Sequence, residues 1–210
     1  MGKWLNYDSP VITKLNKVTD IMLMNLAYIV CCLPVITIGA AKSAMVNVCF
    51  KEEQSVKDFF RAFVREIRTS IPVWIVLLFC GVCLSYSWYI SIEHPFPHSG
   101  IIQIPLGLIT LVYLLVSSQI FLVMGRYECS FMQRFANAAL IAAAHPVRSV
   151  LVSMISVLPY VFFFGDPELF MKLTFVWLLF YFYFEAFLSV RLMQKTYERI
   201  EKADTEEEIS

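Results

Sequence analysis

The stretch IPVWIVLLFCGVCLSYSWYISI occupies residues 71–92 and contains no Asp, Glu, Lys, Arg or His. A second stretch without these residues follows at 101–125, after the polar turn EHPFPHSG at 93–100. A membrane-spanning helix needs about 20 consecutive, mostly apolar residues. The two stretches therefore predict a pair of transmembrane helices joined by a short turn.

The whole chain has the composition of a membrane protein. Of its 210 residues, 59% are hydrophobic and only 16% are charged, whereas a soluble domain has about 45–50% apolar and 25% charged residues. The 17 basic and 17 acidic residues give no net charge, which argues against a nucleic-acid-binding surface. We therefore expect the lipid bilayer, and no nucleic acid, among the partners of this chain.

Further apolar stretches at residues 18–38, 147–164 and about 169–192 raise the expected number of transmembrane helices to about five. The predicted fold is an all-α polytopic membrane protein. It has a polar N-terminal lead-in at 1–17, a helical membrane domain at 18–192 and a partly disordered tail at 193–210. An offset of 72 residues aligns two units, 56–125 and 128–197. A true duplication and a chance alternation of helices both explain this alignment.

Residues 56–69 form the clearer of two predicted amphipathic helices, and the second lies at 131–144. One face of the first helix carries aromatic residues and the other is mostly basic. These faces include Phe59, Phe60 and Phe63 on the aromatic side and Arg61, Arg65 and Arg68 on the basic side. The pattern is typical of a helix that lies in the membrane interface. The alternative is that this helix docks a cytoplasmic partner, with its apolar face laid in a groove of that partner.

Basic residues are distributed unevenly among the polar joints. Residues 51–69 hold five Lys or Arg, 126–148 hold three and 191–202 hold four, whereas the turns at 93–100 and 165–168 hold none. Cytoplasmic loops of membrane proteins carry the excess of Lys and Arg. The sequence therefore predicts a multi-pass protein of the cell membrane with a cytoplasmic C-terminus.

The N-terminal segment does not follow this rule, because Lys3, Lys14 and Lys17 would lie outside if residues 18–38 crossed the membrane once. A re-entrant hairpin bent at residues 34–39 would keep both of its ends inside. Its second arm, residues 40–50, spans only about 16 Å as a helix, and an exposed re-entrant backbone needs cover from other helices. The single crossing is the preferred prediction, and the hairpin stays open.

Few polar groups lie within the predicted spans, and such groups are the first candidates for function in a membrane protein. Glu185 lies in the last span, where it either pairs with a cation near the inner interface, such as Arg191, or lines a polar path. Ser117, Ser118 and Gln119 form a polar patch in the third span. These residues either bond across a helix interface or contact a ligand.

No pattern of catalytic or cofactor-binding residues is present. The motif CGVC at 80–83 lies within a span, and His94, His98 and His145 have no metal-binding spacing. The sequence contains no Walker A loop, Gly-rich dinucleotide loop or HExxH motif. We therefore expect a protein that is not an enzyme, with no catalytic residue, metal or cofactor.

Two motifs resemble those of the bacterial YesL family of integral membrane proteins. The first comprises SP at 9–10, LNKVTD at 15–20, NL at 25–26 and CCLPVITIGA at 31–40. The second comprises GRYE at 125–128 and FANA at 135–138, and the pattern of spans resembles the family over residues 5–195. Its hallmark positions here are Pro34, Thr37, Gly39, Arg126 and Glu128. We expect the first three to break a helix, with Thr37 bonding a freed carbonyl, and the last two to pair.

The resemblance implies a protein of Gram-positive bacteria whose function is uncharacterised. Members of the family are often encoded beside carbohydrate ABC importers, glycoside hydrolases and sugar-sensing two-component systems. The hypothesis that follows is an accessory, non-catalytic membrane subunit of an oligosaccharide ABC importer, with the permease subunits as its partners. The alternative is an independent small-molecule transporter or channel, with Ser117, Ser118, Gln119 and Glu185 along its path.

Overall fold

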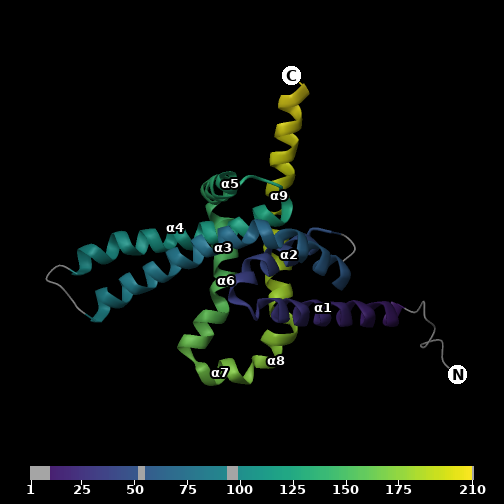
Figure 1. Cartoon of the computed structure of the whole chain (residues 1–210), viewed down its shortest axis with the longest axis horizontal. Helices are drawn as coiled ribbons and strands as arrows, with labels where there is room; N and C mark the ends of the chain where they lie inside the picture. Colours follow the sequence, from purple (N-terminus) through teal and green to yellow (C-terminus); the bar gives the residue numbers. More distant parts are fainter. Residues whose placement is uncertain (1–9, 52–54, 94–98, 210) are drawn as a thin grey trace.

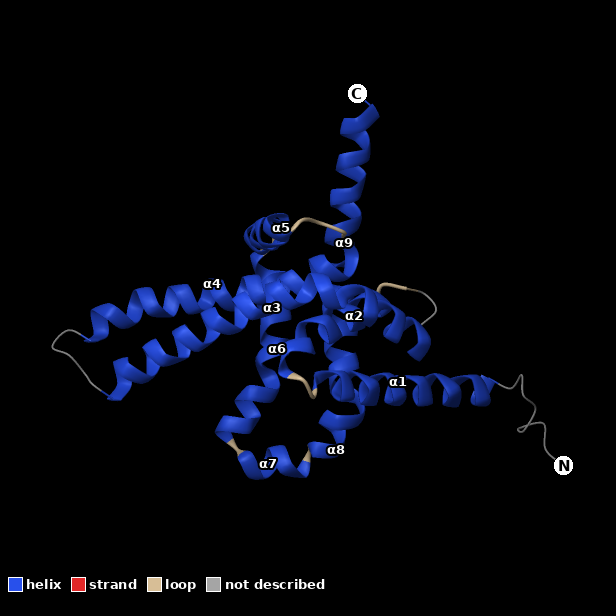
Figure 2. Cartoon of the chain, viewed as in Figure 1, coloured by secondary structure: helices blue, strands red, loops and turns tan. Residues whose placement is uncertain are grey.

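The computed structural model describes residues 10–51, 55–93 and 99–209, and no strand occurs among them (Figure 2). The predicted all-α fold is therefore confirmed. The helices are α1 (Pro10–Cys32), α2 (Ile38–Cys49), α3 (Val56–Glu93), α4 (Ser99–Arg126), α5 (Phe131–Ala144), α6 (Pro146–Gly165), α7 (Pro167–Lys172), α8 (Thr174–Val176) and α9 (Phe182–Ile209). A 3₁₀ turn, η1 (Val35–Thr37), precedes α2, and a π-helix, η2 (Trp177–Tyr181), precedes α9.

Four helical segments of the described chain are long and apolar enough to cross a membrane. They are Val56–Glu93, Ile102–Arg126, Pro146–Gly165 and Thr174–Lys202, and a shorter apolar helix covers Val35–Cys49. The predicted first span at 18–38 is not among the four. Its residues are divided between α1, which ends at Cys32, and the segments η1 and α2, which follow Pro34. The fold is thus a multi-pass bundle with four long apolar helices and one shorter helix.

The amphipathic segment at 56–69 and the span that follows it form one continuous helix, α3, of 38 residues. At 1.5 Å per residue, α3 is about 57 Å long, well beyond the ~30 Å of a hydrocarbon core. Its first part therefore extends past the membrane-spanning length. The second amphipathic segment is a separate helix, α5, because His145 ends it and Pro146 begins α6.

Two helical hairpins extend from a central body in different directions (Figure 1). Helices α3 and α4 form the first, and α6, α7, α8 and α9 form the second. The C-terminal part of α9 projects from the body on the side away from α7, and α1 extends on the side away from the α3–α4 hairpin. The tail expected at 193–210 is helical through Ile209.

Helix α2 occupies the centre, where it packs against α3, α4 and α9. Its Ala40, Ala41, Ala44 and Val48 are fully buried. The approach of α4 is so close that a Cβ on Gly125 would lie 2.5 Å from Val46 Cγ1. The shortest of the apolar helices therefore forms the core on which the longer ones assemble.

Candidate functional site

The break between α1 and α2 is closed by hydrogen bonds to the carbonyls that it frees. Thr37 Oγ1 donates to the carbonyls of Cys31 at 2.6 Å and Pro34 at 2.7 Å. Trp74 Nε1, on α3, donates to the Val35 carbonyl at 2.7 Å. Unsatisfied backbone groups are costly in a bilayer. These bonds therefore let a non-helical turn persist beside apolar helices.

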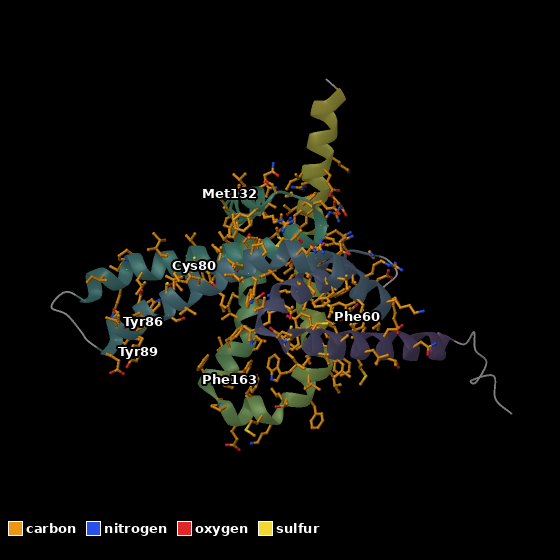
Figure 3. All side chains as sticks on the ribbon, viewed as in Figure 1. Phe60, Cys80, Tyr86, Tyr89, Met132 and Phe163 are labelled. Atoms are coloured by element: carbon orange, nitrogen blue, oxygen red, sulfur yellow. The ribbon has the colours of Figure 1, made fainter. Side chains whose placement is uncertain are left out.

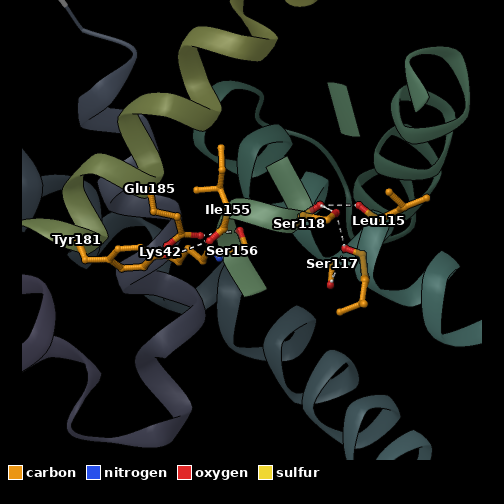
Figure 4. A network of polar contacts seen from close by, with 10 residues as sticks. Lys42, Leu115, Ser117, Ser118, Ile155, Ser156, Tyr181 and Glu185 are labelled. Atoms are coloured by element: carbon orange, nitrogen blue, oxygen red, sulfur yellow. Dashed lines mark hydrogen bonds and ion pairs between the residues drawn. The ribbon is translucent and has the colours of Figure 1, made fainter. Parts of the chain in front are cut away.

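Immediately after this break, Lys42 on α2 lies against Glu185 on α9. Glu185 is the only acidic residue of α9 before the C-terminal tail at 193–210. Lys42 Nζ lies 2.8 Å from Glu185 Oε1, and the two side chains are 24% and 9% exposed. The same carboxylate oxygen accepts a hydrogen bond of 2.6 Å from Ser156 Oγ on α6. Figure 4 shows the three side chains converging from α2, α6 and α9. We call them the Lys42–Glu185–Ser156 cluster.

The cluster neutralises both charges inside the bundle. Breaking a buried ion pair costs about 3–5 kcal/mol, because one charge then stays uncompensated. The Lys42 ammonium also lies 5.6 Å from the centre of the Phe121 ring on α4. Lys42 thus ties α2 to both α9 and α4, and Glu185 pairs with Lys42 rather than with Arg191. The guanidinium of Arg191 instead lies over the Phe187 ring at 5.2 Å.

One turn before Glu185, the π-helix η2 is held by a side chain from α1. Asn25 is fully buried, and its Nδ2 donates to the Leu178 carbonyl at 2.6 Å. Its Oδ1 accepts from the backbone N–H of Tyr183 at 2.9 Å. A π-helix widens the turn and changes the backbone hydrogen bonds of an α-helix. Asn25 therefore supplies bonds on both sides of this irregular turn.

The polar patch formed by Ser117, Ser118 and Gln119 lies on α4 and bonds to α6 at a different level from the cluster. Ser118 Oγ lies 2.8 Å from Ser153 Oγ, and Gln119 Nε2 donates to Ser149 Oγ at 3.1 Å. Ser117 Oγ donates to the Leu114 carbonyl of its own helix. Figure 4 shows Ser117 and Ser118 apart from Glu185. No contact joins this patch directly to Glu185 in the part of the chain that the structure describes.

Sequence reasoning missed both partners of Glu185. Lys42 is the one charged residue in the segment IGAAKSAMVNVC, and that isolation is the signal that could have identified it. Ser149, Ser153 and Ser156 recur at i, i+4 and i+7, which places them on one face of a helix. All three bond to buried polar groups from other helices.

At the C-terminal end of α4, Arg126 pairs with Glu201 and not with Glu128. Its Nε and Nη2 each donate to one carboxylate oxygen of Glu201 at 2.8 Å. The guanidinium also lies 4.9 Å from the centre of the Phe50 ring. The pKa of Tyr127 is raised to about 12, mainly because the hydroxyl is buried and also because it donates a hydrogen bond to Glu201. These contacts join the ends of α2 and α4 to the C-terminal part of α9.

The polar contacts described above mainly connect one helix to another. Within residues 10–51, 55–93 and 99–209, no group of three His, Cys, Asp or Glu side chains could hold a metal ion. Most of the cysteines lie apart along the helices, and all six are free thiols. The interior polar groups described above bond mainly to one another and to the backbone.

The comparisons with known proteins yield one family match. No curated protein and no solved structure matches the chain. The family match covers Asn25, the break at Pro34, helix α2 with Lys42 and most of α3, but not α9. It does not name the YesL family, so that resemblance stays a prediction. Residues 21–88 of this multi-pass membrane protein match a family described as "Protein of unknown function, DUF624".

Proposed function

We propose that this chain is an accessory, non-catalytic membrane subunit that packs its helices against the permease subunits of a bacterial oligosaccharide ABC importer. The observation that carries the proposal is the α3–α4 hairpin, whose outer part extends away from the central body (Figure 1). The inner part of the hairpin belongs to the core, and the outer part that lies away from the central body is available to contact another membrane protein.

The outer part of α3 has the side chains that membrane helices use to pack together. Val76, Cys80, Cys83 and Ser87 recur at alternating intervals of four and three residues, and all four are exposed. Such spacing places them on one face of the helix. Small residues let two helix backbones approach closely in a bilayer. The hydroxyl of Ser87 is already bonded to the Cys83 carbonyl at 2.8 Å, so packing against this face leaves no hydroxyl without a partner.

The aromatic residues of the hairpin support a position within the bilayer. Tyr86 and Tyr89 project outward near its tip (Figure 3), and both are exposed. Aromatic residues concentrate at the boundary between lipid and water. The tip then lies at the outer boundary, whereas the basic joints and the C-terminus face the cytoplasm.

The importer as partner is inferred from the YesL resemblance and from the genes beside members of that family. The sequence contains no Walker A loop with which to hydrolyse ATP, so an ATP-driven role requires other subunits. An accessory role is also consistent with the Lys42–Glu185–Ser156 cluster, where both charges are already neutralised.

Pull-down from native membranes tests this proposal. The permease pair should co-purify with the unaltered chain, and Cys83→Leu should reduce its recovery because the larger side chain keeps the partner helix away. Val82→Leu is the matched control, since Val82 is exposed on a different face of the same turn. If no permease co-purifies, or if deletion of the chain leaves oligosaccharide uptake unchanged, the proposal is wrong.

An independent transporter or channel is the second candidate, and one observation favours it. The bend before α2 precedes Lys42 and the π-helix before α9 precedes Glu185, so each residue of the pair follows an interrupted helix. Transporters often build sites from interrupted helices. Glu185→Ala should then abolish solute flux into proteoliposomes that contain the purified chain. Flux that is absent from the unaltered chain would exclude this candidate.

A further inference from the structure

A charged pocket of about 360 Å³ lies between the first part of α3, the connection from α4 to α5, and α5 itself. Arg65 and Glu66 line it from α3, Tyr127 and Glu128 from the connection, and Arg134 from α5. Tyr127 and Glu128 directly follow the candidate span that ends at Arg126. The pocket therefore lies where the chain leaves the membrane, at the level of lipid headgroups.

Arg134 carries a buried positive charge that no carboxylate neutralises. Its residue is 8% exposed, and its guanidinium donates to two backbone carbonyls, of Thr69 at 2.7 Å and Cys129 at 2.9 Å. Among the residues that the structure describes, no acidic side chain forms an ion pair with it. A buried guanidinium held by neutral acceptors keeps unused N–H donors and attracts an anion.

The local structure holds this guanidinium in place. Ser130 begins α5 with a capping box in which the Gln133 side chain accepts from the Ser130 backbone N–H at 3.0 Å. Arg134 follows in the first turn of the same helix. Its bond to the Thr69 carbonyl connects this turn to α3. The cation is thus positioned by two helices before any ligand binds.

The remaining charges of the pocket divide into a satisfied pair and an available carboxylate. Arg65 Nη2 lies 3.1 Å from Glu66 Oε1, so these two neutralise each other. Glu128 is exposed and forms no ion pair with any described residue. What remains is one cation, Arg134, and one anion, Glu128, which give the pocket no net charge.

We propose that this pocket binds a phosphoethanolamine group, as carried by phosphatidylethanolamine in the bilayer. The phosphate is recognised by Arg134 and the primary ammonium by Glu128. A headgroup with one negative and one positive charge matches the charges of the pocket, whereas the glycerol headgroup of phosphatidylglycerol carries no cation to pair with Glu128. A choline group, which has no N–H, cannot donate a hydrogen bond to the carboxylate.

Native mass spectrometry of the full chain in detergent tests this assignment with equal amounts of phosphatidylethanolamine, phosphatidylglycerol and phosphatidylcholine. Phosphatidylethanolamine should be retained most strongly. Glu128→Gln should weaken its retention about tenfold, the effect of losing one charge-assisted hydrogen bond, without changing that of phosphatidylcholine. Because Glu128 is exposed, this variant should fold normally. Arg134→Gln should lower the retention of all three lipids.

Arg68→Gln is the matched control, because Arg68 lies one turn from Arg65 on α3, is exposed and does not line the pocket. Its lipid retention should equal that of the unaltered chain. Equal retention of the three lipids, or an equal loss in Glu128→Gln and Arg68→Gln, would overturn the proposal. Soluble phosphoethanolamine is added as a competitor in a separate arm. Displacement of the lipid only at large excess identifies the membrane as the source of the group, whereas displacement at equimolar amounts identifies the soluble compound.

Discussion

The Lys42–Glu185 pair predicts that two damaging substitutions will partly compensate each other. Lys42→Met leaves the Glu185 carboxylate without its cation, and Glu185→Leu leaves the Lys42 ammonium without its anion. The double variant removes both charges and replaces them with apolar side chains. If the pair stabilises the fold as a neutral unit, the double variant should be more stable than the sum of the two single changes predicts.

The geometry sets the expected size of these effects. The charged atoms are 2.8 Å apart and the Glu185 side chain is 9% exposed, which corresponds to about 3–5 kcal/mol for the loss of one partner. The Lys42 side chain is 24% exposed, so an unpaired charge at this position can reach some water. We therefore expect about 3 kcal/mol for each single variant, and a coupling of about 2 kcal/mol in the double variant.

Thermal unfolding of the chain in detergent, followed by circular dichroism, measures this cycle. A loss of 3 kcal/mol lowers Tm by about 6–12 °C in a chain of this size. Lys172 and Glu168 supply the control, since their charged atoms are 2.7 Å apart but the side chains are 67% and 81% exposed. Replacing both by Ala should leave Tm unchanged. Losses in the two single variants that simply add in the double variant would refute the reasoning.

Three further changes test other contacts by the same unfolding assay or by hydrogen exchange. Asn25→Leu should lower stability by about 3 kcal/mol, because a carbonyl and an N–H at the π-helix lose their partner; Asn16→Leu, at an exposed site on α1, should have little effect. Gly125→Ala should cost about 1–3 kcal/mol, since its Cβ would lie 2.5 Å from Val46, whereas Gly107→Ala, with no atom within 4 Å, should be neutral or stabilising. Arg126→Gln should speed amide exchange in the C-terminal part of α9 by breaking both bonds to Glu201; unchanged exchange relative to Arg191→Gln would show that this pair does not hold the tail.

Much of the fold follows from local sequence. The long uncharged stretches identify four helices that could cross a membrane, and Pro146 separates α5 from α6 as its position predicts. Pro72 is different, because it lies inside α3 without ending it. Proline removes one backbone hydrogen bond and disfavours helix interiors. The presence of Pro72 in the sequence therefore does not show by itself whether the helix stops or continues.

The candidate site was harder to predict because its members are far apart in the chain. Glu185 stood out as a carboxylate in an apolar stretch, but no local pattern connects it to Lys42 on α2. The same is true of Arg126 and Glu201, since a neighbouring acidic residue, Glu128, offers a nearer partner in sequence. Only the packing of α2 and α4 against α9 decides both pairings.

The central position of α2 has a consequence for how the protein is made. Helix α2 spans about 18 Å, carries Lys42, and finds its neutralising partner on a helix that is synthesised much later. At about 5–20 residues per second, the ribosome needs about 7–29 seconds to reach Glu185 after Lys42. During that interval the Lys42 ammonium has no anionic partner. It must therefore stay in contact with water or with the insertion machinery. The ion pair of this central helix can therefore form only after α9 has been made, and mutations that impair biogenesis should concentrate around it.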